Sequence, residues 1–162
     1  MKTINNILII VLITTVQNFS QDKLDFTLDL VDGESKAFSE IYPDGPLLVN
    51  FWALWCKPCR TEMKALVNLY AKYSADGFQI LGINQDTPRS LAKVRSFVES
   101  HQIDYLIALD PNKEIFEMYN GQVIPLSILY DKEGNILYQS TGYLPGDEFK
   151  LEEEIVKALE VK

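Results

Sequence analysis

Hydrophobic positions recur along this chain with two different periods, and each period predicts a different kind of element. Phe26, Leu28 and Leu30 alternate with polar residues, which predicts a strand with one buried face. Residues 47–52, Leu-Leu-Val-Asn-Phe-Trp, form a short apolar run that is typical of a strand buried on both faces. Further strands are predicted at residues 36–39, 78–83, 105–109, 126–130 and 136–141. The last two flank a polar turn and are expected to form a hairpin.

Other hydrophobic residues follow the spacing of helices. One set lies at i, i+3, i+4 and i+7 and predicts an amphipathic helix that ends near Gly77. Its members are Met63, Leu66, Val67 and Tyr70. Three more helices are predicted to begin at Thr87-Pro88, at Asp110-Pro111 and at Asp147, which are residue types that favour helix N-termini. Strands alternate with helices early in the chain and a hairpin comes late, so the order indicates an α/β fold with a mixed sheet.

Length and composition indicate one domain with an ample core. The chain has 162 residues, of which 47% are hydrophobic. A domain of this size needs no disulfide or metal to hold it together, so its two cysteines are available for chemistry. There are 15 Lys and Arg residues against 23 Asp and Glu, and no run of basic residues. Nucleic-acid binding depends on basic patches, so we predict no nucleic-acid partner.

The first twenty residues differ from the rest of the chain. Lys2 is the only charge before Asp22, and residues 7–16 form an almost unbroken apolar run. That run has the length of a signal-peptide core and is shorter than the ~20 residues of a membrane span. We predict a signal peptide over residues 1–20, cleaved near Ser20, and a folded domain over residues 21–162. An uncleaved membrane anchor is the alternative, and both place the domain outside the cytoplasm.

The segment Trp55-Cys56-Lys57-Pro58-Cys59 lies where the buried strand meets the first helix. Two intervening residues at a helix N-terminus bring the two sulfurs close enough to form a disulfide. The helix dipole and the free N–H groups of the first turn would stabilise a thiolate on Cys56, the species that attacks disulfides. We therefore predict Cys56 as the nucleophile and Cys59 as the cysteine that resolves the mixed disulfide.

Two other uses of the cysteine pair are possible. A structural disulfide across so short a loop would constrain the unfolded chain little. A closed zinc site needs about four Cys or His ligands, and His101 is the only histidine in the chain. A redox pair that needs no metal and no other cofactor is the interpretation that the position before a helix favours.

Residues 51–60, Phe-Trp-Ala-Leu-Trp-Cys-Lys-Pro-Cys-Arg, resemble the active-site segment of the thioredoxin superfamily. The chain is more similar to the exported TlpA/ResA-like thiol–disulfide oxidoreductases than to cytosolic thioredoxin. The similarity extends over nearly all of residues 25–162, with further marks at 109–111, 123–125 and 130–135. The resemblance implies a thioredoxin-like fold, in which helices flank a central mixed β-sheet, here with an N-terminal β-hairpin extension.

The resemblance also implies a substrate-binding surface around the disulfide. In the family, the proline that matches Pro125 follows a cis peptide bond and packs beside the disulfide, and its backbone neighbours pair with the substrate chain. We expect the same of Ile124-Pro125. The other expected substrate contacts are Trp55, Lys57 and Pro58. Lys57 either stabilises the thiolate or is simply solvated, and Trp52 either joins Trp55 in an apolar rim or belongs to the core.

Two positions bear on proton transfer. Thioredoxin has a buried Asp six residues before the first cysteine, and this chain has Asn50 there, which is neither acid nor base. ResA-like members have a Glu three residues after the second cysteine, where this chain has Glu62. Burial would raise the pKa of Glu62 and let it shuttle a proton for Cys59; a solvated helix Glu is the alternative.

The expected function is dithiol–disulfide exchange with protein substrates, most simply as a reductase supplied by a membrane thiol electron donor. The resemblance points to cytochrome c maturation or general disulfide reduction as its use. One alternative is a peroxidase of the AhpC/TSA type, but those enzymes carry a Thr three residues before the reactive cysteine, where this chain has Ala53. The other is a redox-inert peptide-binding or chaperone module on the same fold.

Overall fold

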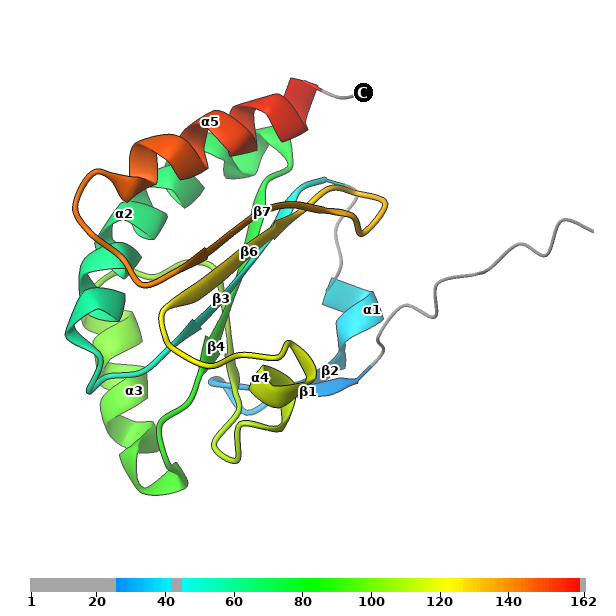
Figure 1. Ribbon diagram of the computed structural model, residues 1–162. Coiled ribbons are helices and arrows are strands. Elements are labelled where there is room, and N and C mark those ends of the chain that lie inside the picture. The colour runs from blue at the N-terminus through cyan, green and yellow to red at the C-terminus, as the bar shows by residue number, and fades with distance from the viewer. Residues whose placement is uncertain (1–25, 42–44, 161–162) are drawn as a thin grey trace, which may run out of the picture.

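The computed structural model describes residues 26–41 and 45–160 and shows a mixed seven-stranded sheet between two layers of helices (Figure 1). The strand order across the sheet is β2-β1-β5-β4-β3-β6-β7. The strands are β1 (Thr27–Leu30), β2 (Ser35–Ala37), β3 (Leu47–Trp52), β4 (Gln79–Asn84), β5 (Leu106–Leu109), β6 (Leu126–Tyr130) and β7 (Ile136–Thr141). The thioredoxin-like α/β fold, including the N-terminal hairpin of β1 and β2, is therefore confirmed.

The helices divide between the two faces of the sheet. They are α1 (Phe38–Ile41), α2 (Lys57–Tyr73), α3 (Leu91–Ser100), α4 (Glu114–Met118) and α5 (Asp147–Glu160), with 3-10 turns η1 (Ser74–Asp76) and η2 (Pro88–Ser90). Figure 1 shows α2, α3 and α5 on one face of the sheet and the short α1 and α4 on the other. Among the described residues, no helix combines the length and the apolar character that crossing a membrane requires.

The core lies on both faces of the sheet because its central strand is buried along its whole length. All six residues of β3 are buried. Since side chains alternate along a strand, Leu48 and Trp52 pack under α2, whereas Val49 and Phe51 pack toward α4. Asn50 shares the α2 face with Leu48 and Trp52 and is the polar residue of this buried strand.

Strand pairing fixes what lies next to Asn50. β3 pairs in parallel with β4 and antiparallel with β6. In this register Asn50 stands opposite Gly82 on one side and Ser127 on the other. A side chain on Gly82 would collide with Ile107, since a Cβ at that position would lie 2.7 Å from the Ile107 Cδ1. Under α2, the side chain of Asn50 therefore lies beside that of Ser127 on one side and beside Gly82, which has no side chain, on the other.

Two predicted boundaries are wrong. The second strand was expected over residues 36–39, but it ends at Ala37 and the chain turns into α1. The Ala37 N–H donates to the Glu40 carboxylate, and the Phe38 ring stacks on Phe26 at 4.9 Å, so local contacts favour a helical turn there. The helix expected to begin at Thr87-Pro88 begins at Leu91, because Thr87 precedes the short turn η2 instead. The Thr87 side chain makes no capping hydrogen bond.

The remaining predicted elements are confirmed to within four residues of their expected limits, and three strands match them in full. The predicted helix after Asp110-Pro111 begins at Glu114, and Asp110 accepts hydrogen bonds from the N–H groups of Ile115 (3.2 Å) and Phe116 (2.9 Å). The predicted signal peptide, residues 1–20, lies outside the described residues.

Replacing Asp110 with alanine should destabilise the fold. The variant D110A leaves the two N–H groups of α4 without their acceptor inside the protein, and we expect the free energy of unfolding to fall by about 1–2 kcal/mol. Urea unfolding followed by circular dichroism measures the change. D104A, at an exposed aspartate six residues earlier, is the matched control. Equal stabilities of the two variants would show that this cap contributes nothing.

Candidate active site

The two cysteines lie at the junction of β3 and α2, at one end of the sheet. Cys56 is the N-cap residue of α2, and its sulfur accepts the N–H of Cys59 at 3.2 Å. The two residues form a disulfide with a Cα–Cα distance of 5.3 Å. Pro58 occupies the first turn, where no intrahelical hydrogen bond is lost. The predicted placement of the pair at a helix N-terminus is therefore confirmed.

The loop before Cys56 is held by groups at the end of β4. The Leu54 N–H donates to the Asp86 carboxylate at 2.7 Å, and Asn84 donates to the same carboxylate at 2.9 Å. The guanidinium of Arg60 donates to the Leu54 carbonyl. Sequence analysis missed Asn84 and Asp86. The sequence did offer one signal, since both residues lie at or just after the end of the buried strand β4, which runs parallel to β3. The carboxyl ends of parallel strands meet at one edge of a sheet, which places these side chains near the end of β3.

The two sulfur-bearing residues differ in exposure. Cys56 is 5% exposed, whereas Cys59, in the first turn of α2, is completely buried. Cys56 is thus the more accessible of the two residues.

The peptide bond between Ile124 and Pro125 is cis, as the resemblance implied. This segment leads into β6, which is the neighbour of β3, and so lies beside the disulfide. The Ile124 carbonyl oxygen is 3.8 Å from the Cys56 sulfur, and Pro125 is buried. A substrate backbone that reached Cys56 would pass next to Ile124.

Glu62 lies one turn of α2 beyond Cys59 and is 3% exposed. Its carboxylate accepts hydrogen bonds from the Asn50 amide (2.8 Å) and the Ser127 hydroxyl (2.8 Å), and the amide also donates to Ser127 Oγ at 2.9 Å. Burial raises the pKa of Glu62 to about 7, although both hydrogen bonds oppose the shift; the charge of Asp147 adds to it. Glu62 is thus not a solvated helix residue, and it can give or take a proton near neutral pH.

The residues expected around the disulfide differ in exposure, and only some of them lie at the surface. Trp52 is completely buried and packs against Phe97 at 5.6 Å, so it belongs to the core and not to an apolar rim. Trp52 belongs to the core cluster of Leu48 and the residues of α2, and this decides between its two possible roles. Trp55 is 65% exposed, and Lys57 and Pro58 are exposed beside it at the tip of the helix.

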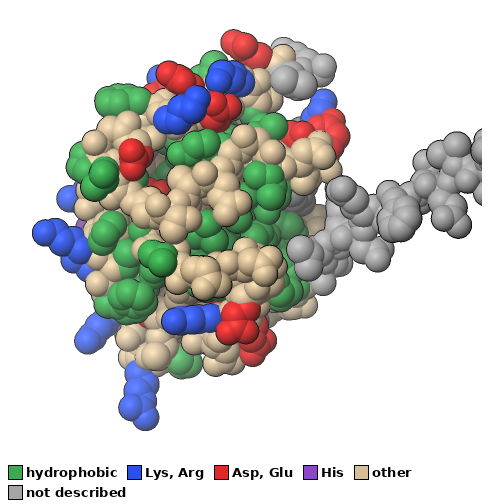
Figure 2. Space-filling model, viewed as in Figure 1, with side chains coloured by type: hydrophobic (Ala, Val, Ile, Leu, Met, Phe, Trp, Pro, Cys, Tyr) green, Lys and Arg blue, Asp and Glu red, His purple; other side chains and the backbone are tan. Residues whose placement is uncertain are grey.

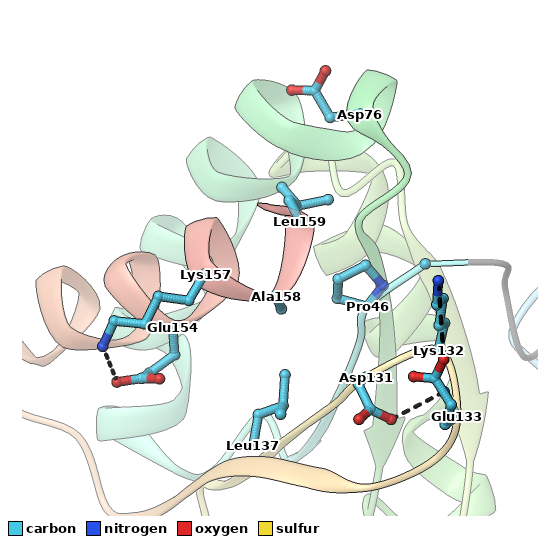
Figure 3. Close-up of a pocket in the computed structure, with 11 residues that line it drawn as sticks. Pro46, Asp76, Asp131, Lys132, Glu133, Leu137, Glu154, Lys157, Ala158 and Leu159 are labelled. Carbon is cyan, nitrogen blue, oxygen red and sulfur yellow. Dashed lines mark hydrogen bonds and ion pairs between the residues drawn. The ribbon is translucent and has the colours of Figure 1, made fainter. Parts of the chain in front are cut away.

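Two other features lie apart from this chemistry. His101 ends α3, where its ring stacks on Phe97 at 4.0 Å. A cavity of about 480 Å³ lies at the opposite end of the sheet, between the start of β3, the β6–β7 turn and the C-terminal half of α5 (Figure 3). Within residues 26–41 and 45–160, no three His, Cys, Asp or Glu side chains are grouped as metal ligands.

A reachable cysteine at a helix N-terminus, a buried partner one turn further and an adjacent cis-proline define a thiol–disulfide oxidoreductase with a thioredoxin-like fold. Comparison with known proteins agrees. The chain belongs to the AhpC/TSA family of thioredoxin-like proteins, whose model matches residues 20–139.

Two relatives and one solved structure show which thiol–disulfide oxidoreductases the chain is similar to. The thiol-disulfide oxidoreductase ResA of Geobacillus kaustophilus is 31% identical over 133 residues, which are 82% of this chain and 75% of the relative. ResA of Halalkalibacterium halodurans is 30% identical over 75% of this chain and 68% of its own length. A candidate DsbE thiol:disulfide interchange protein from Chlorobium tepidum has a structure with a TM-score of 0.75 and 31% identity, over 83% of this chain and 93% of that one. The protein is therefore a thiol–disulfide oxidoreductase of the ResA/DsbE type, with the cysteine pair as its redox centre.

Burial of Glu62 should make stability depend on pH. Its pKa is about 7 in the folded protein and near 4.5 when unfolded, so the unfolded chain loses the proton first as pH rises. Folding is therefore progressively penalised from about pH 4.5 to pH 7. E62Q has no such penalty, and its stability relative to wild type should rise by about 2–3 kcal/mol between pH 4 and pH 8.

Urea unfolding of the oxidised proteins across this range measures the difference. E153Q neutralises an exposed carboxylate on α5 and is the control. If E62Q and E153Q followed the same pH dependence, Glu62 would not be a buried acid.

Proposed function

We propose that the protein is an exported reductase of protein disulfides. The thiolate of Cys56 attacks one sulfur of a substrate disulfide, a mixed disulfide forms, and the other substrate sulfur leaves as a thiolate. Cys59 then attacks the Cys56 sulfur, which releases the substrate reduced and leaves the enzyme oxidised. The observation that carries this proposal is the unequal exposure of the two cysteines, because only Cys56 can meet a substrate.

We assign proton transfer with Cys59 to Glu62. Cys59 must lose its proton to attack and regain one when the enzyme is reduced again. Glu62 lies on the same face of α2, three residues further, and Asn50 cannot titrate. With a pKa of about 7, the Glu62 carboxyl can serve as base in one half of the cycle and as acid in the other.

The substrate surface combines apolar contact with backbone pairing. Trp55 offers a large exposed apolar side chain directly before the nucleophile, and Pro58 is exposed at the helix tip. Ile124 would offer its backbone to an extended substrate segment, next to the buried Pro125. Lys57 is exposed between the cysteines, where its charge would favour the thiolate of Cys56.

The proposed setting follows from the N-terminal residues and the chemistry. An apolar run at residues 7–16 supports export by a signal peptide over residues 1–20, with residues 21–162 as the folded domain. An oxidising compartment such as the periplasm would exhaust a reductase that had no electron supply, so a membrane thiol donor is required. Cytochrome c maturation or general disulfide reduction is the proposed use.

A peroxidase function is not supported by the site, although the matching family model also carries the AhpC name. Ala53 stands three residues before Cys56, is completely buried and has no hydroxyl to activate a peroxide. A redox-inert module is distinguished from an enzyme by turnover.

Insulin reduction with dithiothreitol as donor tests the enzyme and the roles of its cysteines. Wild type should accelerate insulin precipitation, and C56S should lose all acceleration because the reachable nucleophile is gone. C59S should instead accumulate a mixed disulfide with the substrate, which non-reducing mass spectrometry detects. Trapping by C56S rather than C59S would reverse the assignment, and absence of turnover in wild type would support the inert module.

The reduction potential of the Cys56–Cys59 couple tests the direction. Equilibration with defined thiol buffers should give a value near that of thioredoxin, about −270 mV. A value near about −120 mV, as in strong periplasmic oxidants, would make the protein an oxidase.

A further inference from the structure

Glu62 is buried, but it forms the inner wall of a narrow cavity that opens between α2, β7 and the start of α5. The cavity measures about 10 Å³, close to the space of one water molecule. Ala65, Ser140, Tyr143, Asp147 and Glu148 are among the other residues that line it. Figure 1 shows the first turn of α5 beside α2, on the same face of the sheet.

The acidic side chains of this lining accept several hydrogen bonds. The Tyr143 hydroxyl donates to the Glu148 carboxylate at 2.5 Å, and the Gly146 N–H donates to the same oxygen at 2.7 Å. The Asp147 carboxylate accepts the Leu144 N–H at 2.7 Å. Figure 2 shows acidic and basic side chains mixed over α5, but the described residues that line this cavity include three carboxyl groups and no Lys or Arg.

We propose that Asp147, which lines this cavity together with Glu62, is a positioning residue that favours protonation of Glu62 while the cysteines form a disulfide. This inference rests on the proposed role of Glu62. When a donor thiolate attacks Cys56, the Cys56–Cys59 bond breaks and the electron pair goes to the Cys59 sulfur. A protonated Glu62 supplies the proton that makes Cys59 a thiol, and the donor remains bonded to Cys56 until its second thiol releases it.

Asp147 fits this role better than its neighbours. It is exposed and charged, and its charge favours the protonated form of Glu62. The Glu148 carboxylate instead accepts hydrogen bonds from Tyr143 and Gly146, and these bonds lower the pKa of its carboxyl. The other titratable groups near Glu62 are Tyr105, Tyr138, Tyr143 and, on its own helix, Cys59. Burial raises the pKa of Tyr105 and of Tyr143, so both are neutral at the pH of the reaction.

The test removes the charge and keeps the hydrogen bond. The amide oxygen of Asn can accept the Leu144 N–H as the Asp147 carboxylate does, so D147N should retain this bond. The side-chain carboxyl of Glu62 is titrated by carbon-13 NMR in the oxidised full-length protein, where thiols do not titrate, with E62Q to assign the signal. The midpoint in D147N should shift to lower pH by about half a pH unit, the size of a partly screened charge interaction. E153Q on the same helix should leave it unchanged.

The consequence for the reaction is read from single-turnover reduction of the disulfide by dithiothreitol. Because the protonated fraction of Glu62 falls with its midpoint, D147N should be about threefold slower than wild type at pH 8 and equal to it at pH 5.5. An unshifted NMR midpoint would overturn the inference, as would a shifted midpoint with an unchanged rate at pH 8. If E62Q itself reacted like wild type, the fault would lie with the proposed role of Glu62 and not with the coupling to Asp147.

Discussion

The site depends on the position of β3 between β4 and β6. This strand is buried on both faces, and its register with both neighbours is continuous over its length. Its end fixes where the chain must leave the sheet, and so where α2 begins with Cys56. Its middle places Asn50 beside Ser127, under the point where the first turns of α2 cross the sheet. Displacing β3 by one residue would turn Asn50 away from α2, so Glu62 would lose its amide donor and Ser127 would lose its neighbour on β3.

Burial of the Glu62 carboxylate lowers the stability of the folded state, and two hydrogen bonds offset only part of this effect. No cation contacts the carboxylate among the described residues; two neutral donors do, the Asn50 amide and the Ser127 hydroxyl. A Lys or Arg in their place would hold the pKa of Glu62 low and leave a permanent anion with no proton to give. Neutral donors satisfy the oxygens in both protonation states, because a hydroxyl can also accept. The arrangement is thus suited to an acid that must change its charge inside the core.

Much of the fold could be predicted from local patterns, whereas contacts between distant segments could not. Alternation identified β1, and the apolar run identified β3, because burial leaves its period in the sequence. The Cys56–Cys59 pair was predictable from its spacing and its place before a helix. The bond between Asn50 and Ser127 joins residues 77 positions apart and depends on strand register, which no local pattern encodes. The family resemblance alone pointed to the cis peptide bond before Pro125.

The arrangement separates two choices that disulfide exchange has to make. In the proposed mechanism, exposure decides which sulfur reacts with a partner, since Cys59 is completely buried and Cys56 is not. In the same proposal, the proton on Glu62 decides whether the buried sulfur can act as nucleophile or leaving group, because a buried thiolate without a nearby acid would be costly in the core. The first choice is fixed by packing and cannot vary with conditions. The second would change with pH and with charges near Glu62, so in this mechanism residues outside the Cys-X-X-Cys segment adjust the rate of each half of the cycle without altering the nucleophile.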